Sequence, residues 1–409
     1  MTKLISHPPY TPVEPVTETL HGIPITDPYR WLEDQESSET RTWLTAQTQY
    51  ARAYLDAIPG RERIRERVRQ LLDVENYDSI HKAGNRYFFR KRLPTQEQPC
   101  MYFREGRNGS DQLLIDPTEC GAGDHAAVNL FFPSPDGRLL LFEVKDGGER
   151  TGTFHLLDVQ SRETLPDSLA RGYLRGFAFA PDCQSFYYVH EAVAATRPNH
   201  RAAYHHVLGT SFDDDCEIFS AGEGENIRLH IVPGKQRLGF LVYRFLDPMC
   251  TDFYLWDPEK KDAPEPLIRD ATYKFGPYLM DDGRILAITD RGTASFRIVQ
   301  LRLQAGMEPE FVDIISEKES QIQGCLITQD RIFVARIRCA TVVVDIFDHG
   351  GEYLGQLPGG TDDTIRLAGS SRDGPEVFVE EESFTRPIQT YLYSPASNEI
   401  NLWAEKKVP

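Results

Sequence analysis

The chain has 409 residues, of which 40% are hydrophobic and 26% are charged, a composition typical of a folded globular protein and not of a disordered one. Its 62 acidic residues outnumber 45 Lys and Arg, so the formal net charge of -17 disfavours binding to nucleic acids and anionic membranes. The length allows one large domain or two to three ordinary ones.

The first residues, MTKLISHPPYTPVEP, place prolines where a signal peptide needs an apolar segment, and no later segment is long and apolar enough to cross a membrane. We therefore expect a soluble protein that stays in the cytoplasm. Seven cysteines are widely spaced and form no C-x-x-C pair, so we expect reduced thiols in the core.

Residues 1–74 are expected to form a helical N-terminal arm. Ser37 or Ser38 caps a helix whose apolar residues recur at helical spacing and which ends at Pro59-Gly60. A second helix, GRERIRERVRQLLD, has an apolar stripe on one side and alternating Arg and Glu on the other. Both stripes require a packing partner.

Residues 75–409 contain an internal repeat with the period-two pattern of β-strands. Tight-turn signals recur roughly every 44–53 residues, a spacing typical of propeller blades. They lie at Ala83-Gly84-Asn85, Asp136-Gly137, Asp182-Cys183, Pro233-Gly234, Asp282-Gly283, Gln329-Asp330 and Asp373-Gly374. An apolar strand follows each turn, and further strands bring each unit to four. The sequence therefore predicts an all-β, seven-bladed β-propeller with four antiparallel strands per blade.

The phase of this repeat predicts how the ring closes. The first unit opens near Asp78 to Lys82, and the seventh closes near Glu399 to Trp403, so no blade is divided between the two ends of the repeat. The first and last blades are then joined by side-chain packing and scattered hydrogen bonds, which makes their boundary a place for opening.

Several segments resemble the prolyl oligopeptidase family of serine peptidases. They are His21-Gly22, DPYRWLED (27–34), ETRTWLTAQ (39–47), YFFRKR, QPCMYFRE and SPDGRLLLFEVKDGG. The resemblance implies that the arm packs on a C-terminal α/β-hydrolase domain with a Ser-Asp-His triad, and that the propeller covers the active site and admits short peptides. The sequence stops at EKKVP, where that family's chain passes back into the hydrolase domain.

The residues themselves offer no complete catalytic motif. A nucleophile elbow requires G-x-S-x-G or a close variant, and the nearest sequences, around Ser211 and around Ser370 and Ser371, lack the second glycine at the right spacing. Ser79-Ile80-His81-Lys82 fits S-x-x-K without the accompanying K-T-G. A pair of tunnel carboxylates acting on sugars is a weaker alternative.

Metal sites are similarly incomplete. His190-Glu191 begins an H-E-x-x-H motif, but Ala194 replaces the second histidine. His205 and His206 point to opposite faces of a strand, and the acidic run 213–215 lacks the alternating ligands of a calcium loop and is expected to be a solvated turn. We assign no catalytic, cofactor-binding or metal-binding residue and expect no cofactor.

Two functions remain open. The first is the gating, substrate-filtering propeller of a prolyl oligopeptidase-type serine endopeptidase, which we expect to be inactive alone. The chain would then be a truncated reading frame, one half of a split enzyme or a fragment ending at the domain boundary. Its partners are short peptides and a hydrolase domain supplied in trans. The alternative is a stand-alone propeller that binds peptides or proteins. A further expectation is that the arm's uncovered apolar stripes leave residues 1 to about 74 loosely attached.

Overall fold

The computed structural model describes residues 7–35, 37–120, 125–260, 262–304, 306–316, 321–338, 341–359, 364–370 and 374–409. The chain divides into two units, Met1–Asp73 and Val74–Val408, which are treated separately here. No helix of the described residues combines the length and the apolar character that a bilayer-spanning segment needs.

The first unit contains the two predicted helices, α1 (Ser38–Asp56) and α2 (Arg61–Leu72), together with the short 3-10 helix η1 (Arg30–Glu33). The Ser37 hydroxyl accepts a hydrogen bond from the Thr40 amide at 3.1 Å, so Ser37 is the N-cap of α1. Gly60, at φ 84°, separates the two helices. The predicted boundaries of both helices are confirmed.

The arm also contains a β-hairpin that the sequence pattern did not predict. Strands β1 (Val16–Leu20) and β2 (Ile23–Asp27) pair around His21 and Gly22, which both have positive φ. The segment DPYRWLED begins where this hairpin ends, and Arg30 forms ion pairs with Glu18 at 2.6 Å and with Asp27 at 3.1 Å. The hairpin is short and its strands are mostly exposed, so no alternation of apolar residues reveals it in the sequence.

The second unit consists of seven four-stranded antiparallel blades within the described residues, as predicted. Blades one and two contain β3 (Asn76–Ala83), β4 (Arg86–Arg92), β5 (Cys100–Glu105), β6 (Gln112–Ile115), β7 (Ala127–Pro133), β8 (Leu139–Lys145), β9 (Gly152–Asp158) and the first part of β10 (Thr164–Phe179). Blades three and four contain the rest of β10, β11 (Ser185–Ala192), β12 (His200–Val207), β13 (Cys216–Glu223), β14 (Ile227–Pro233), β15 (Leu238–Arg244), β16 (Cys250–Trp256) and β17 (Glu265–Ala271).

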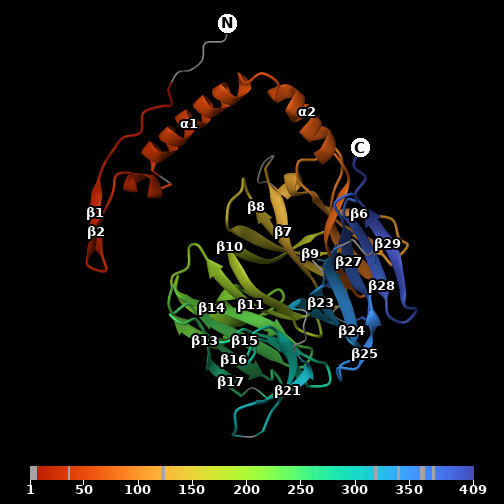
Figure 1. The fold of residues 1–409 in the computed structure, drawn as a ribbon. Helices are drawn as coiled ribbons and strands as arrows, with labels where there is room; N and C mark the ends of the chain where they lie inside the picture. Colours follow the sequence, from red (N-terminus) through yellow and green to blue (C-terminus); the bar gives the residue numbers. More distant parts are fainter. Residues whose placement is uncertain are drawn as a thin grey trace. The chain divides into compact units, whose positions relative to one another are not determined.

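The remaining three blades follow the same order along the chain (Figure 1). They contain β18 (Phe275–Leu279), β19 (Ile285–Thr289), β20 (Arg297–Arg302), β21 (Glu310–Ile315), β22 (Ile322–Ile327), β23 (Ile332–Arg338), β24 (Thr341–Phe347), β25 (Tyr353–Gln356), β26 (Thr364–Ser370), β27 (Val377–Glu382), β28 (Gln389–Ser394) and β29 (Glu399–Glu405). Six of the seven predicted turns lie wholly within described residues between the first two strands of their blades. The seventh includes Asp373, which lies outside them.

One strand belongs to two blades, which the repeat pattern did not show. The first part of β10 pairs with β9 and the second part with β11, so blades two and three share one continuous sheet. Gly172 pairs with both neighbours, opposite Gly152 and Ala192. A Cβ atom at Gly172 would lie 2.4 Å from the Glu191 carbonyl oxygen, so only glycine fits where the strand passes between blades.

Neighbouring blades pack through buried apolar residues from both sides of each boundary. At the turns between their first two strands they also meet through the backbone. Arg86 donates to the Gly137 carbonyl at 2.9 Å, Arg138 donates to the Cys183 carbonyl at 3.5 Å, and Arg237 donates to the Gly283 carbonyl. In each case an arginine near the start of a blade's second strand holds the turn of the next blade.

We expect Gly137→Ala to lower the unfolding free energy by about 2–3 kcal/mol, because Gly137 has φ 71° and an added Cβ would lie 2.7 Å from the Ala83 carbonyl of the preceding blade. Gly209→Ala is the matched control, since Gly209 has φ 80° but no atom within 4 Å of its Cβ position. Urea denaturation should show a loss of only about 1 kcal/mol for the control. Equal losses for both variants would contradict the inter-blade contact.

Candidate functional site

The serines weighed as nucleophiles are not placed in a catalytic arrangement where the structure describes them. Ser211 precedes the 3-10 helix η3 (Phe212–Asp214) and accepts a hydrogen bond from the Asp213 amide at 3.3 Å, which is a structural cap. The side chain of Ser370 and the whole of Ser371 lie outside the described residues. Ser79 has positive φ and donates to Asp78, while the ring of the exposed His81 contacts Phe131 edge-on.

His190 and Glu191 form no metal site, and no group of three possible metal ligands occurs in the part of the chain that the structure describes. Glu191 instead accepts from Arg175 at 3.2 Å and lies 3.4 Å from Arg201, so two guanidinium groups neutralise it. Burial lowers the pKa of His190 to about 4 and keeps the ring neutral.

The stability of the fold should therefore fall as the solution becomes acidic. His190 has a lower pKa in the folded chain than the usual 6.5, so between pH 6.5 and about 4 the unfolded chain binds more protons and gains up to about 1.4 kcal/mol per pH unit. We expect His190→Phe to flatten this dependence in denaturation curves at pH 7 and pH 5. The matched control His125→Phe, at an exposed position, should keep the wild-type slope. An unchanged slope in His190→Phe would contradict this explanation.

His205 and His206 point to opposite faces of β12, as predicted. The His205 ring stacks on Tyr187, whereas His206 is fully buried between two carboxylates, 3.0 Å from Asp167 and 2.8 Å from Asp215. Tyr188 also donates to Asp215, at 2.8 Å. The expectation of a solvated acidic turn is thus wrong for Asp215, whose side chain is only 3% exposed because it accepts these two inward-facing donors.

The cysteine prediction is partly correct. Cys100 and Cys183 are buried and reduced, but Cys216 is exposed because it begins an outer strand. Cys325 lies beside Tyr278, and burial raises the pKa of its thiol to about 11, which suppresses the nucleophilic thiolate. Cys339 lies outside the described residues.

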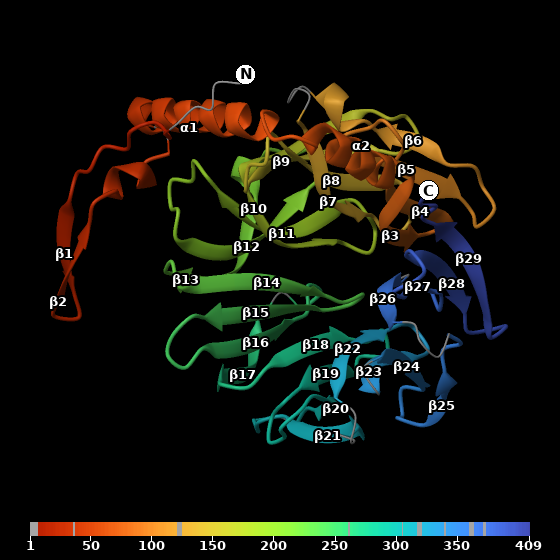
Figure 2. The ribbon, with the colours of Figure 1, turned by 45° about the horizontal axis from the view of Figure 1, so that its top comes forward.

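The boundary between the first and last blades is the structurally distinctive part of the ring, and we call it the seam. Strand β3 pairs with β4, β29 pairs with β28, and in the described residues no ladder connects β3 with β26 or β29. These strands nevertheless lie side by side, where the blue blade meets the orange blade in Figures 1 and 2. The predicted ring without a divided blade is confirmed.

Aromatic side chains fill the seam. The Trp403 ring contacts Phe89, Tyr77 and Phe378 edge-on, at centroid distances of 5.0, 5.5 and 5.5 Å. The guanidinium group of Arg104 lies over Trp403, 4.3 Å from the ring centroid. Phe89 and Phe378 are fully buried, so this contact excludes water from the interior of the seam.

One ion pair crosses the seam beside this aromatic cluster. The Lys82 ammonium lies 2.5 Å from a Glu376 carboxylate oxygen, and the Tyr87 hydroxyl donates to the same oxygen at 2.9 Å. Both charged side chains are about four-fifths buried, which gives the pair more weight than an exposed surface pair. Sequence reasoning considered Lys82 only as part of an S-x-x-K match and missed Glu376, because these residues are far apart in the sequence.

A cavity of about 460 Å³ lies among the innermost strands of blades four to six. Ile231, Tyr278 and Ile327 contribute to its walls, one from each of the three blades. Innermost strands line the central channel of a propeller, so this cavity opens toward the channel. Its lining mixes apolar residues such as Ile231 and Ile327 with polar ones such as Asp281 and Thr328.

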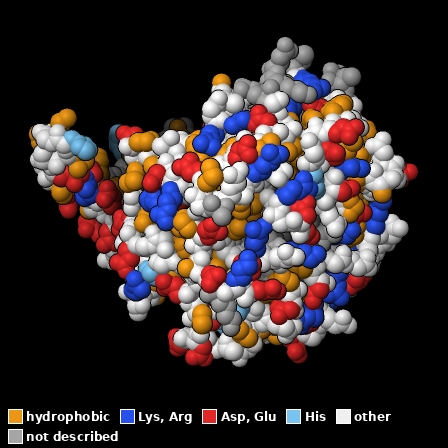
Figure 3. Space-filling model, turned by 90° about the horizontal axis from the view of Figure 1, so that it is seen from below, with side chains coloured by type: hydrophobic (Ala, Val, Ile, Leu, Met, Phe, Trp, Pro, Cys, Tyr) orange, Lys and Arg blue, Asp and Glu red, His pale blue; other side chains and the backbone are white. Residues whose placement is uncertain are grey.

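Charged side chains on the surface are interspersed by sign. Figure 3 shows Lys and Arg next to Asp and Glu, with apolar side chains between them and no broad area of a single charge on this face. Apolar residues are also exposed on loops that join the second and third strands of several blades, including Phe245 and Leu246, each 54% exposed, and Phe384, which is fully exposed.

Comparison with known proteins connects this geometry to a family. The sequence profile described as the prolyl oligopeptidase N-terminal β-propeller domain matches residues 8–406. The chain belongs to the prolyl oligopeptidase family. It is similar to the prolyl endopeptidases of Elizabethkingia miricola, at 22% identity over 401 residues, and Elizabethkingia meningoseptica, at 24% over 425 residues. These alignments cover 96% and 100% of this chain.

The solved structures agree with this assignment. A structure from a study of two prolyl endopeptidases superposes with a TM-score of 0.85 and 25% identity, covering 98% of this chain and 60% of that one. Prolyl oligopeptidase B of Galerina marginata, bound to a 35mer substrate, gives a TM-score of 0.80 at 17% identity and shares the fold. The chain spans 56% and 57% of the lengths of the two Elizabethkingia enzymes.

We expect Trp403→Ala to loosen the seam selectively, because it removes a large, half-buried aromatic side chain that packs across the seam on Phe89 and Tyr77, at a cost of up to about 3 kcal/mol. Hydrogen exchange should become faster in β3, β26 and β29 than in the other blades. Trp256→Ala in blade four is the matched control and should speed exchange around β15 and β16 instead. Uniformly faster exchange across all blades in Trp403→Ala would show that the seam does not open as a separate unit.

Proposed function

We propose that this chain is the substrate-filtering propeller part of a prolyl oligopeptidase-type serine endopeptidase that acts on short peptides. The observation that carries the proposal is a family propeller in whose described residues no strand ladder joins the first and last blades, which meet instead through Trp403 packing on Phe89 and Tyr77. A gap that opens there, or the channel among the inner strands, admits an extended chain but not a folded protein.

The relatives support the peptidase part of this proposal. The two Elizabethkingia proteins are named prolyl endopeptidases, and the Galerina marginata enzyme is described as bound to a peptide substrate for hydrolysis and macrocyclization. The packing energy across the seam is small enough to allow the seam to open and close as a gate. Three edge-on aromatic contacts cross the seam, Trp403 with Phe89, Trp403 with Tyr77 and Phe378 with Tyr87. Each is worth about 0.5–1.5 kcal/mol beyond area burial, so together they are weaker than the core of a blade.

The chemistry requires a hydrolase domain beyond these 409 residues. The sequence contains no nucleophile elbow, and acyl transfer from a peptide bond needs a nucleophile, a base and an oxyanion hole together. In this proposal the propeller limits which substrates reach the catalytic groups, and a Ser-Asp-His triad on the hydrolase domain cleaves them.

We expect the 409-residue chain by itself to release no chromophore from proline-containing p-nitroanilide peptides. The assay compares the purified chain with the same chain treated with a serine-directed phosphonate. Turnover that persists through purification and disappears with the phosphonate would contradict the assignment of the catalytic groups to another domain.

The gating role is tested in a chimera that places residues 74–408 in the propeller position of the Elizabethkingia meningoseptica enzyme. Lys82→Cys and Glu376→Cys, bridged by a short bismaleimide, close the seam covalently. Cleavage of a short peptide should slow at least tenfold on bridging, while the matched pair Lys235→Cys and Asp281→Cys, which lies between blades four and five, should leave the rate unchanged. Undiminished cleavage with a closed seam would overturn the seam as the substrate path.

A further inference from the structure

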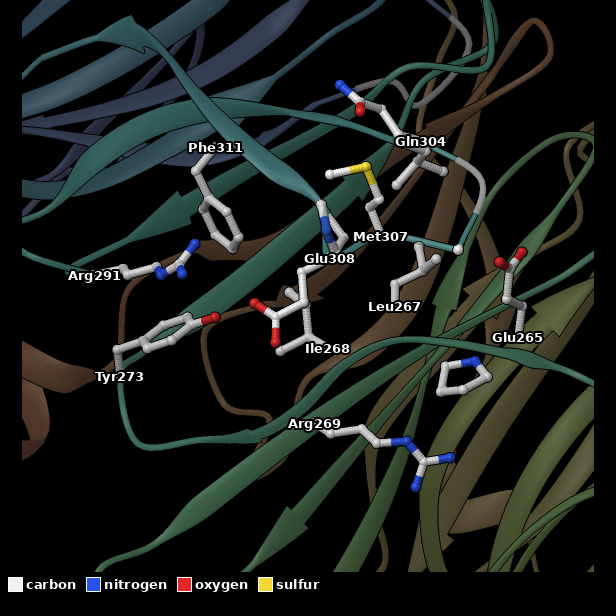
Figure 4. Close-up of a pocket in the computed structure, with 14 residues that line it drawn as sticks. Glu265, Leu267, Ile268, Arg269, Tyr273, Arg291, Gln304, Met307, Glu308 and Phe311 are labelled. Atoms are coloured by element: carbon white, nitrogen blue, oxygen red, sulfur yellow. The ribbon is translucent and has the colours of Figure 1, made fainter.

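A second cavity, of about 580 Å³, lies away from the innermost strands and shares no lining residue with the first. Its walls come from β17, the outermost strand of blade four, and from the β20–β21 hairpin and the 290–296 loop of blade five (Figure 4). Because β17 pairs only with β16 in the described sheet, one edge of its backbone is free on the side of the propeller.

Arg291 extends into this cavity between two aromatic rings (Figure 4). Its guanidinium carbon lies 4.3 Å from the centroid of Phe311 and 5.5 Å from that of Tyr273, and the two rings are T-shaped at 6.1 Å. Stacking of this kind fixes the plane of the guanidinium group and leaves its N–H edges available for a planar two-oxygen acceptor.

The Arg291 side chain forms no hydrogen bond or ion pair with any described residue, although its own carbonyl accepts from Arg297. Arg297 and Arg244 differ from it, since they pair with Asp313 and Asp252. Arg269, which also lines the cavity, lies over the Tyr254 ring at 5.8 Å. Burial raises the pKa of Tyr273, so its phenol is neutral at physiological pH and gives Arg291 no anionic partner.

Apolar side chains form other walls of the cavity. Leu267 and Ile268 come from β17, and Met307, which is 68% exposed, comes from the β20–β21 hairpin. Figure 4 places Met307 and Leu267 on the inner side of Arg291, toward which its guanidinium group points. A ligand that satisfies both features has a carboxylate next to a branched or unbranched aliphatic group.

We propose that this cavity binds an aliphatic carboxylate of the kind found at the C-terminus of a peptide that ends in leucine or a similar residue. The terminal carboxylate accepts two hydrogen bonds from Arg291 and the last side chain packs against Leu267, Ile268 and Met307. The preceding residues extend along the free edge of β17. This site is separate from the seam and the channel, and it does not depend on the peptidase assignment.

Glu308 provides a second test of the proposal, because its carboxylate also lines the cavity and lies near Tyr273 in Figure 4. A bound anion is repelled by this charge. Removing the charge with Glu308→Gln should therefore strengthen binding of the acid, whereas loss of the cation with Arg291→Gln should weaken it. A general loosening of the loop would affect both variants in the same direction.

The test is isothermal titration of the intact chain with acetyl-Ala-Ala-Ala-Leu as the free acid and as the C-terminal amide. We expect the acid to bind at least tenfold more tightly than the amide, Arg291→Gln to abolish this preference, and Glu308→Gln to increase it severalfold. Arg162→Gln, which removes one exposed cation on blade two, is the matched control and should keep the wild-type preference. Circular dichroism and the urea midpoint of each variant verify that it is folded.

N-acetylleucine serves as a second probe, because its carboxylate and side chain are those of the peptide terminus without the preceding residues. Weaker binding than the peptide, with the same loss in Arg291→Gln, supports a peptide ligand that uses the edge of β17. Equal binding of acid and amide by the wild-type chain, or an unchanged preference in Arg291→Gln, would overturn the proposal. Because the measurement is binding to this chain alone, failure here leaves the filtering function untouched, and the reverse also holds.

Discussion

In the described part of the chain, side-chain contacts and no strand ladder join the first and last blades, and the integrity of the ring depends on them. Elsewhere successive blades are linked by the chain itself, and several are also held by arginines that donate to the turn of the next blade. At the seam the aromatic cluster around Trp403 and the Lys82–Glu376 pair replace those links. Packing of this kind is strong when closed and carries no covalent constraint against opening.

Blades two and three, by contrast, are joined through a continuous sheet. Strand β10 passes through both blades, and a buried polar cluster joins them a second time, since Asp167 lies on the blade-two part of β10 and His206 lies on β12 of blade three. A carboxylate lies at each ring nitrogen of His206, Asp167 at Nε2 and Asp215 at Nδ1, and Tyr188 also donates to Asp215. Such fully bonded buried groups favour one arrangement of the two blades. The ring is thus uneven, with a continuous sheet at one boundary and a contact of side chains at another.

Charge is organised locally despite the strongly acidic composition. Arginines near the strand ends pair with carboxylates on the same blade, as Arg244 does with Asp252 and Arg338 with Asp345, and this neutralises the interior of each blade. The excess of acid is therefore distributed over the surface among cations and apolar residues, as on the face in Figure 3. Arg291 lies between two aromatic rings and forms no ion pair with a described residue, and its cavity shares no lining residue with the one among the innermost strands.

The sequence by itself determined the seven-blade count, the four strands per blade, the two arm helices and the ring with no divided blade, because each rests on local periodicity and turn residues that recur in order. It also contained the family signature in the arm. Only the tertiary structure placed Glu376 beside Lys82 and Trp403 beside Phe89, stacked Arg291 between Tyr273 and Phe311, and turned Asp215 toward His206. Those contacts join residues on different strands or loops, and often on different blades, so they depend on ring closure and strand register, which no local pattern encodes. The hairpin β1–β2 and the shared strand β10 escaped prediction for a related reason. An exposed hairpin lacks alternation, and a strand that serves two blades has no turn to mark where one ends.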